Sequence, residues 1–469
     1  MRHSLSLFFT SLVTVLPLTA LAQPTAPAPD QPTAGPAATP TAAAPAAPAP
    51  NEPAGPAIAS EPVAPQHGEP SAAHDAAPAP VVETAPAPAH KAEPFKGFQV
   101  QSEDGAYQLK IGGYVQADGR FFTQAKGSPI NTFAVRRARL ELKATVAHYF
   151  EFRLQPDFAE SKVVLLDAYG NIHLIDEVQL QAGKMKSPLG LEYLQSPTDL
   201  LFPEFGLPTS LVPQRDVGFY VHGNIQKDTF TYQLGLFNGV ADGTNGDLDD
   251  NRAKDFEYRI FAQPFKPLKV KELEGFGIGL AGTVGKQKGV LPTFKTPGRE
   301  TFFSYAATAT ADGNRVRFSP QGYYYYGPLG VLGEYVLSKQ AVADGGSSGK
   351  IKTQAWQVAG SFVIGGKASY KGAEVDSPLD PKAGTWGALE LGLRYGGLSV
   401  ERWPFDVGLA DGNQAARSVS SFGVEASWWF VKGTRAQVSF DQTSFKGGAA
   451  AGGDREKEGV VVTRLQVAL

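Results

Sequence analysis

Basic residues gather at a few points of the chain, in patterns that suit the binding of anions. The guanidinium of arginine presents a planar fork of donors that matches the oxygens of a phosphate. Rings of Arg and Lys are the usual device of pores that pass anions. The candidates that stand closest together are Arg136, Arg137, Arg139, Lys184, Lys186 and Arg215.

The segment 187–213 stands between these lysines and Arg215. It is rich in proline and apolar residues, shows no alternation, and is too long for a simple turn. Connections longer than about 12 to 15 residues are usually functional or disordered, and the apolar content argues against disorder. We therefore expect this segment to fold into the lumen of a pore and to narrow that lumen. In a constriction narrower than the Debye length of about 8 Å, the neighbouring bases act on a solute.

A second interpretation of the same bases stays open. They can equally form ion pairs within the wall of an unselective pore, where their charge is cancelled. The acidic residues available for such pairing are Glu141, Glu151, Asp167 and Glu192.

Other kinds of chemistry find little support in the sequence. The chain has no cysteine, which excludes disulfides, thiolate metal sites and cysteine nucleophiles. Beyond residue 93 the histidines are His148, His173 and His222, without HExxH spacing, and no GxSxG or Walker A motif occurs. His148 could serve a hydrolase only if a serine met it in space. We expect no enzyme activity, no cofactor, no metal and no nucleic-acid partner.

An acidic run suggests calcium binding, but its spacing does not match the twelve-residue EF-hand loop. We expect a solvated external loop there instead. The residues of the run are Asp242, Asp247, Asp249, Asp250 and Asp255.

Alternating hydrophobicity shows which elements hold the bases. In residues 107–122 one face is mostly apolar and the other mostly polar, over a length typical of membrane-barrel strands. An arginine facing lipid at mid-membrane would cost roughly 2–4 kcal/mol, so the charged faces must look inward. Further candidate pore-lining residues on such charged faces are Arg120, Lys143 and Arg153.

The number of such segments predicts an all-β fold, a transmembrane antiparallel barrel. Residues 94–469, at about 20 to 25 per strand with its connection, predict roughly 16 strands and an aqueous lumen. Gly-, Asn- and Asp-rich breaks separate the segments, for example 343–350. Aromatic clusters such as 428–430 suit the girdles at the two membrane interfaces.

The first 93 residues differ from the rest. Residues 1–22 have the basic start, apolar run and small-residue ending of a secretory signal peptide. Residues 23–93 are rich in Pro and Ala and hold 18 of the chain's 36 prolines, which predicts a disordered linker. Residues 94–469 form the predicted barrel domain. Two of the 43 basic and seven of the 46 acidic residues precede residue 94, so the barrel carries a net charge of only +2.

Several stretches, in matching order over residues 97–469, resemble the phosphate-selective porin O and P family. They are FAVRRARLELKATV, LQAGKMKSPLGLEYLQS, RDVG at residues 215–218, GTWGALELGLRYGGLSVE, GVEASWWFVKGTRAQVSFDQT and the terminal TRLQVAL. The resemblance implies a trimer of 16-stranded barrels that take up phosphate or related anions past a ladder of arginines and a cluster of lysines.

Carried over by motif, the resemblance places Arg136 and Arg137 in the pore wall. Lys184 and Lys186 would stand beside the constriction loop, and Arg215 would follow it. One departure is Leu469, because such porins generally end in phenylalanine.

We therefore expect a passive channel for small anions in the outer membrane of a Gram-negative bacterium, in contact with its lipid and assembled as a homotrimer. One alternative is a general or sugar-type diffusion porin. Another is an envelope anchor whose linker engages the cell wall.

Overall fold

The computed structural model describes residues 98–127, 129–249 and 251–469. The signal peptide and the linker predicted for residues 1–93 lie outside the described residues, so both stay predictions.

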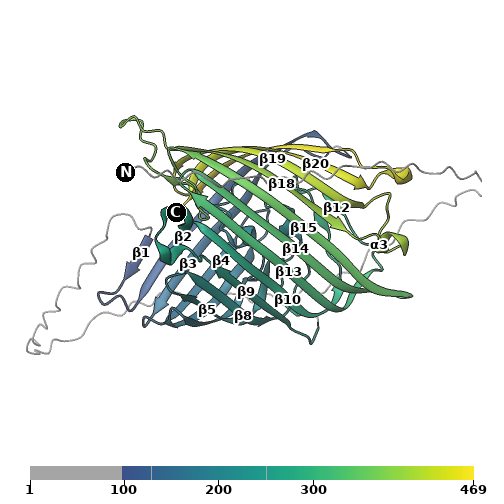
Figure 1. Ribbon diagram of the computed structural model, residues 1–469, viewed down its shortest axis with the longest axis horizontal. Coiled ribbons are helices and arrows are strands. Elements are labelled where there is room, and N and C mark those ends of the chain that lie inside the picture. Colours follow the sequence, from purple (N-terminus) through teal and green to yellow (C-terminus); the bar gives the residue numbers. More distant parts are fainter. Residues whose placement is uncertain (1–97, 128, 250) are drawn as a thin grey trace, which may run out of the picture. The chain divides into compact units, whose positions relative to one another are not determined.

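Sixteen antiparallel strands close into a barrel, as predicted (Figure 1). Closure is made by β21, which pairs with β2. In chain order the strands are β2 (Gln108–Gln124), β3 (Thr132–Val146), β4 (Phe150–Asp157), β5 (Val164–Ile175), β6 (Val178–Lys186), β7 (Arg215–Ile225), β8 (Phe230–Phe237), β9 (Asp255–Ala262), β10 (Phe276–Val290), β13 (Thr310–Tyr326), β14 (Leu329–Asp344), β15 (Ser347–Ile364), β18 (Ala388–Val400), β19 (Ala416–Val431), β20 (Thr434–Gly447) and β21 (Glu458–Ala468).

The remaining elements are short. Strand β1 (Phe98–Gln101) pairs with the start of β2, on the same edge that β21 occupies further along. None of the helices in the described ranges is long and apolar enough to cross a membrane. The other short elements are β11 (Phe294–Lys295), β12 (Thr301–Phe303), β16 (Gly366–Lys367), β17 (Glu374–Val375), α1 (Leu191–Leu194), α2 (Lys271–Glu274), α3 (Trp403–Asp406), η1 (Leu207–Leu211), η2 (Lys266–Leu268) and η3 (Ala450–Gly452).

Alternation along each strand separates the two surfaces of the barrel. On β15, Val358 and Phe362 are exposed on the outer wall, whereas Gln357 and Ala359 on either side of Val358 are buried inside. Successive side chains of a strand point to opposite faces, so an apolar outer surface and a polar lumen follow from period 2.

A β-bulge on β3 changes this phase beside the arginines. Gln116 pairs with Arg137 and Ala117 pairs with Val135, so Arg136 is the extra residue. The outward set before the bulge includes Val135 and the outward set after it includes Leu140, which have opposite parity. An extra residue lets both Arg136 and Arg137 reach the inner side of the wall.

The connections differ in length at the two ends of the barrel. Several connections at one end are short, such as 147–149 and 432–433, and we call it the short-turn end. The other end carries the long loops. The break predicted at 343–350 was too long, because β14 and β15 continue to a two-residue turn at Gly345 and Gly346. The favourable hairpin geometry of a Gly-Gly turn lets both strands run on.

We predict that Val358→Lys lowers the free energy of unfolding by about 2 kcal/mol, because it places a charge within the lipid-facing apolar band. Ser348→Lys, on the same face of β15 near its loop end, should change it by less than about 1 kcal/mol. Urea unfolding in lipid vesicles measures both. Equal effects would contradict the assignment of the lipid-facing band.

Candidate functional site

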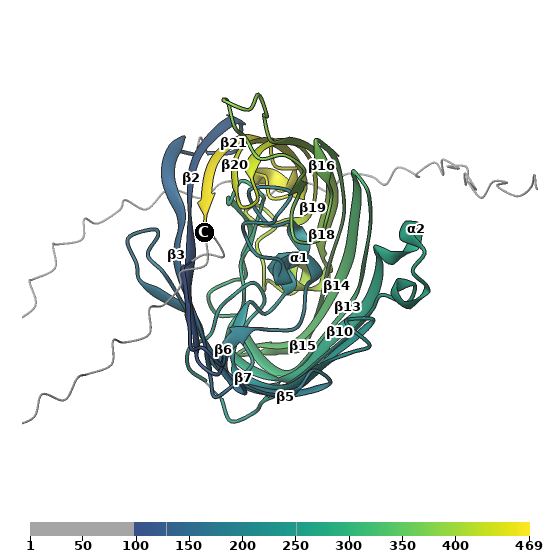
Figure 2. The same ribbon diagram turned by 90° about the vertical axis from the view of Figure 1, so that its left-hand side faces the viewer.

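The segment between β6 and β7, residues 187–214, lies inside the barrel, and Figure 2 shows α1 within the ring of strands. Its second short helix, η1, is held by apolar contacts. Leu207 and Leu211 belong to one buried cluster with Val336 of β14 and Ala355 of β15. The apolar residues of this segment, which argued against disorder, therefore pack against the wall and hold the segment there.

Hydrogen bonds from the wall fasten the part of this segment that has no regular structure. Buried backbone carbonyls must find donors, and residues 197–204 have no neighbouring strand to supply them. Side chains of β2, β18, β20 and β21 supply them instead. The bonds are Gln116 to Pro197 O (3.0 Å), Gln466 to Thr198 O (3.0 Å), Arg435 to Leu200 O (2.6 Å), Gln437 to Leu201 O (2.6 Å), Arg464 to Pro203 O (2.6 Å) and Arg394 to Glu204 O (2.8 Å).

The carboxylate of Glu204 lies among several arginines of the wall. Arg136 donates to it through Nε at 2.5 Å and Nη2 at 3.1 Å. Arg137, Arg464 and Arg120 lie 3.7, 3.8 and 3.9 Å from it. Burial alone would raise the pKa of Glu204, but Arg136 and Arg137 outweigh it and hold that pKa well below its usual range. Glu204 is thus ionised at neutral pH and compensates this arginine cluster.

A cavity of about 320 Å³ lies between the inward segment and the wall formed by β2, β3, β4, β6 and β7. It is lined by Lys143, Arg153, Lys186 and Arg215, with Glu141 as the only acidic lining residue. Glu141 lies 2.6 Å from the ammonium of Lys143 and 3.1 Å from the guanidinium of Arg153. Asp167 pairs with Arg215 at 2.9 Å and with Arg153 at 3.5 Å, so two side-chain carboxylates compensate four bases and the basic cavity keeps an excess of bases.

Two of the bases of the basic cavity also hold α1. Lys186 donates to the carbonyls of Tyr193 and Gln195, each at 2.7 Å. Arg215 donates to the Tyr193 hydroxyl at 2.6 Å and to Asp167 at 2.9 Å. The side chain of Lys143 is 53% exposed and donates to no carbonyl of the inward segment. Lys143 is therefore the base of this cavity that is most available to a solute.

The other predicted site residues lie apart from the basic cavity. Arg139 pairs with Asp157 at 2.7 Å, and Lys184 pairs with Asp247. Arg137 is only 1% exposed. The structure thus brings four of the nine predicted residues to one cavity, ties Arg120, Arg136 and Arg137 to Glu204, and places Arg139 and Lys184 in separate ion pairs.

Only two of the four acidic residues proposed as partners of the bases lie beside them. Glu141 and Asp167 do face the predicted bases, and Asp167 lies 3.5 Å from Arg153. Glu151 instead lies beside His173, and Glu192 lies 3.6 Å from Arg394.

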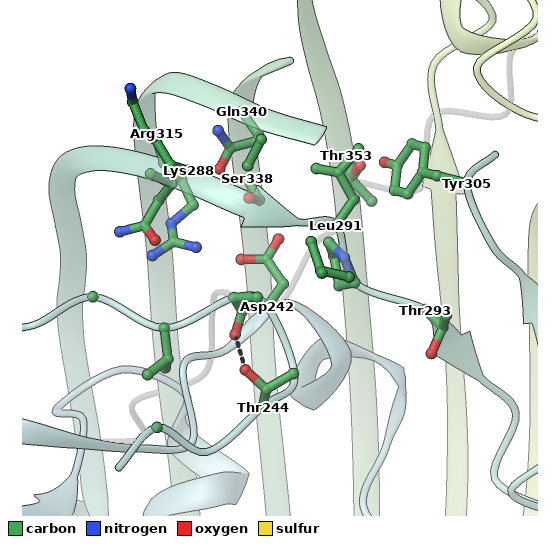
Figure 3. Close-up of a pocket in the computed structure, with 18 of the residues that line it drawn as sticks. Asp242, Thr244, Lys288, Leu291, Thr293, Tyr305, Arg315, Ser338, Gln340 and Thr353 are labelled. Carbon is green, nitrogen blue, oxygen red and sulfur yellow. Dashed lines mark hydrogen bonds between the residues drawn. The ribbon is translucent and has the colours of Figure 1, made fainter. Parts of the chain in front are cut away.

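A second cavity, of about 520 Å³, lies at the long-loop end (Figure 3). Its arginine is compensated, because Arg315 pairs with Asp255 at 2.9 Å, and the neighbouring Arg317 pairs with Asp242 at 2.7 Å. The expectation of a wholly solvated acidic loop was wrong, because Asp242 and Asp255 are 6% and 0% exposed. Lumen-facing arginines attract these carboxylates inward. No cluster of three or more potential metal ligands occurs in the part of the chain that the structure describes.

The residues that donate to the backbone carbonyls of residues 197–204 are not among those predicted from the sequence. Arg394 and Arg464 lie on the polar faces of the runs 389–394 and 461–469, which alternate between apolar and polar residues, so a signal for them was present. Nothing in the pattern distinguishes Glu204 from other loop carboxylates, because its importance arises from arginines of three distant strands.

Comparison with known families agrees with this architecture. Residues 109–468 match the family model described as phosphate-selective porin O and P. The chain belongs to the phosphate-selective porin O and P family. It is an outer-membrane β-barrel porin, as the sequence predicted, and its long-loop end is the external end, since such barrels have short periplasmic turns and longer extracellular loops.

Solved structures of porins are similar to this chain at low sequence identity. An anion-selective porin from Comamonas acidovorans is 12% identical, with a TM-score of 0.50 over 77% of this chain and 100% of that one. OprB of Pseudomonas putida is 10% identical, with a TM-score of 0.48 over 78% and 95%. A loop-deleted OmpT of Vibrio cholerae is 14% identical, with a TM-score of 0.46 over 77% and 100%. No curated protein sequence matches this chain.

We predict that Glu204→Gln lowers the free energy of unfolding at pH 7 by about 3 kcal/mol or more, because it leaves buried arginines without their counter-charge. The folded pKa of Glu204 is depressed, so its stabilising effect is present above the unfolded pKa of about 4.3 and declines as pH falls below it. Urea unfolding in vesicles should show the difference from wild type shrinking toward pH 3.

The matched control is Glu272→Gln in α2. This exposed carboxylate forms no ion pair with any residue that the structure describes. The control should unfold like the wild type at every pH, and a similar loss in both variants would contradict the role given to Glu204.

Proposed function

We propose that this porin passes small anions by diffusion and prefers them to cations. The observation that supports the proposal is the basic cavity, whose lining has four bases and one carboxylate beside the inward segment. The working residues act by attracting an anion and replacing part of its hydration, without bond making.

The inward segment makes these charges effective. At physiological salt, charges more than about 8 Å apart are largely screened in water. Residues 194–198 of the inward segment line the same cavity as Lys143 and Arg153. A solute in this space lies well within the screening length of the bases. A solute on the axis of a barrel without the inward segment would lie beyond that length.

Within the anions, we propose phosphate or a related oxyanion as the solute. Lys143 and Arg153 present donors in one cavity, and several donors can bind the several oxygens of one phosphate. The family supports the same choice by its name. A general diffusion porin is the alternative, and the pairing of Glu141 with both of these bases favours it.

We also propose a homotrimer, with the wall of β3 to β5 at its interface. Apolar side chains on this wall continue to the external end, where Phe133 and Val163 are 80% and 73% exposed. Contiguous exposed apolar surface marks interaction sites. A solved OmpT of Vibrio cholerae is described as a trimer.

We predict an anion-selective reversal potential for the purified protein in a planar bilayer under a KCl gradient, and partial block of the chloride current by added phosphate. Replacing Lys143, Arg153 and Lys186 by Gln removes three positive charges from the cavity and should reduce the anion-to-cation permeability ratio at least about threefold at low salt.

The control for that measurement removes the same charge elsewhere. Lys227, Lys269 and Lys271 lie in connections at the short-turn end, outside the basic cavity. Their replacement by Gln should leave the permeability ratio unchanged. A cation-selective or indifferent wild-type channel would refute the anion proposal and support the general porin.

We predict that Phe133→Glu together with Val163→Glu converts the trimer into monomers, since each places a charge in the proposed apolar interface. Sedimentation in detergent measures the assembly. Val290→Glu, an exposed apolar residue at the external end of β10, is the control and should leave it intact. Monomers in the wild-type protein would contradict the proposal.

A further inference from the structure

Lysines occupy the outer wall of the barrel near its external end, on the face opposite to the lumen. They continue the outward-facing rows of side chains on β10, β14 and β15. In these rows Val284, Leu337 and Val358 lie nearer the short-turn end than the lysines do. We call them the outer lysine patch. Its members are Lys286, Lys288, Lys339, Lys350 and Lys352.

Two of these lysines stand directly opposite each other. Lys339 on β14 and Lys352 on β15 are register partners, and both are exposed. Like charges directly opposite on neighbouring strands destabilise a sheet. No lysine of the patch forms an ion pair with any residue that the structure describes, so the protein itself does not offset this repulsion.

Carboxylates around the patch are too few to neutralise it. Asp312 is the register partner of Lys288, and Asp344 ends β14. Glu401 accepts a hydrogen bond from the backbone of Lys352 at 2.9 Å. Five lysines against these three acids leave the patch positive.

The aromatic girdle fixes the height of the patch in the membrane. Trp356 and Tyr395 are exposed on the outer wall with ring centroids 5.3 Å apart, and Tyr335 is the register partner of Trp356. Aromatic girdles mark the interfaces of the apolar band. Lys352 precedes Trp356 by four residues on the same face, which places it about 13 Å nearer the external end at about 3.3 Å per residue. The lysines therefore begin where hydrocarbon ends and headgroups begin.

The patch also has a shape that can receive a headgroup. A groove of about 770 Å³ runs between these strands and the neighbouring loop. Lys286, Lys288, Lys350 and Arg252 line it, with Asp312 as the only acidic lining residue. Basic clusters directly beside an apolar membrane segment bind anionic lipid headgroups.

We propose that the outer lysine patch binds the phosphate groups of phosphorylated lipids in the outer leaflet. The opposite wall supports this assignment by contrast, because β3 to β5 keep apolar residues such as Phe133 up to the external end. The bound phosphates offset the repulsion between Lys339 and Lys352, and they fix the rotational setting of each barrel against the lipid.

The test compares lipid retention by full-length protein purified in detergent. The probes are a diphosphorylated, acylated disaccharide and the same glycolipid after enzymatic removal of its phosphates, and native mass spectrometry counts the bound molecules. Changing Lys339, Lys350 and Lys352 to Gln should weaken retention of the phosphorylated form about tenfold or more, since each base near the surface contributes about fivefold.

The control is the short-turn variant of Lys227, Lys269 and Lys271, which should retain the glycolipid like the wild type. Equal retention of the two glycolipids would overturn the proposal, as would equal loss in both variants. Displacement by excess inorganic phosphate would assign the patch to free phosphate and would also overturn it. The reversal potential should be unchanged in the patch variant, which separates this site from the pore.

Discussion

The structure depends on one constraint, the need of buried backbone carbonyls for donors. Residues 197–204 run along the inner wall without joining a β-ladder, and five of their carbonyls accept hydrogen bonds from Arg or Gln side chains of β2, β20 and β21. Without these donors the segment would leave unsatisfied polar groups inside the barrel, which costs more than staying in water. The wall and the inward segment therefore specify each other.

This constraint divides the bases of the lumen by role. Arg394, Arg435 and Arg464 are committed to carbonyls, and Arg136 is committed to Glu204, so their charge mainly holds structure. The basic cavity on the other side of the segment keeps an excess of positive charge. A near-neutral barrel can in this way keep a local excess of bases beside the inward segment. The outer wall likewise concentrates positive charge at one place, because the outer lysine patch borders on an apolar surface.

Much of the fold follows from the sequence because period 2 reports directly which face of a strand meets lipid. The strand number and the inward position of Arg120, Lys143 and Arg153 follow in the same way. The path of residues 197–204 could not be predicted, since alternation does not say which side chain meets which carbonyl. Arg136 and Arg137 could not both be placed inward by alternation alone, because a β-bulge changes the phase between them. The burial of Asp242 could not be predicted either, because it depends on the ion pair with Arg317, which is distant in sequence.

The most direct test of the account uses the absence of cysteine from the chain. A cysteine in place of Lys143 would be the only thiol, and charged thiol reagents can then set the charge at that point of the cavity. The account predicts that a positively charged reagent restores anion selectivity in the planar bilayer and that a negatively charged one lowers it below that of the unmodified variant. Selectivity that does not respond to the sign of the reagent would contradict the claim that the basic cavity selects the solute.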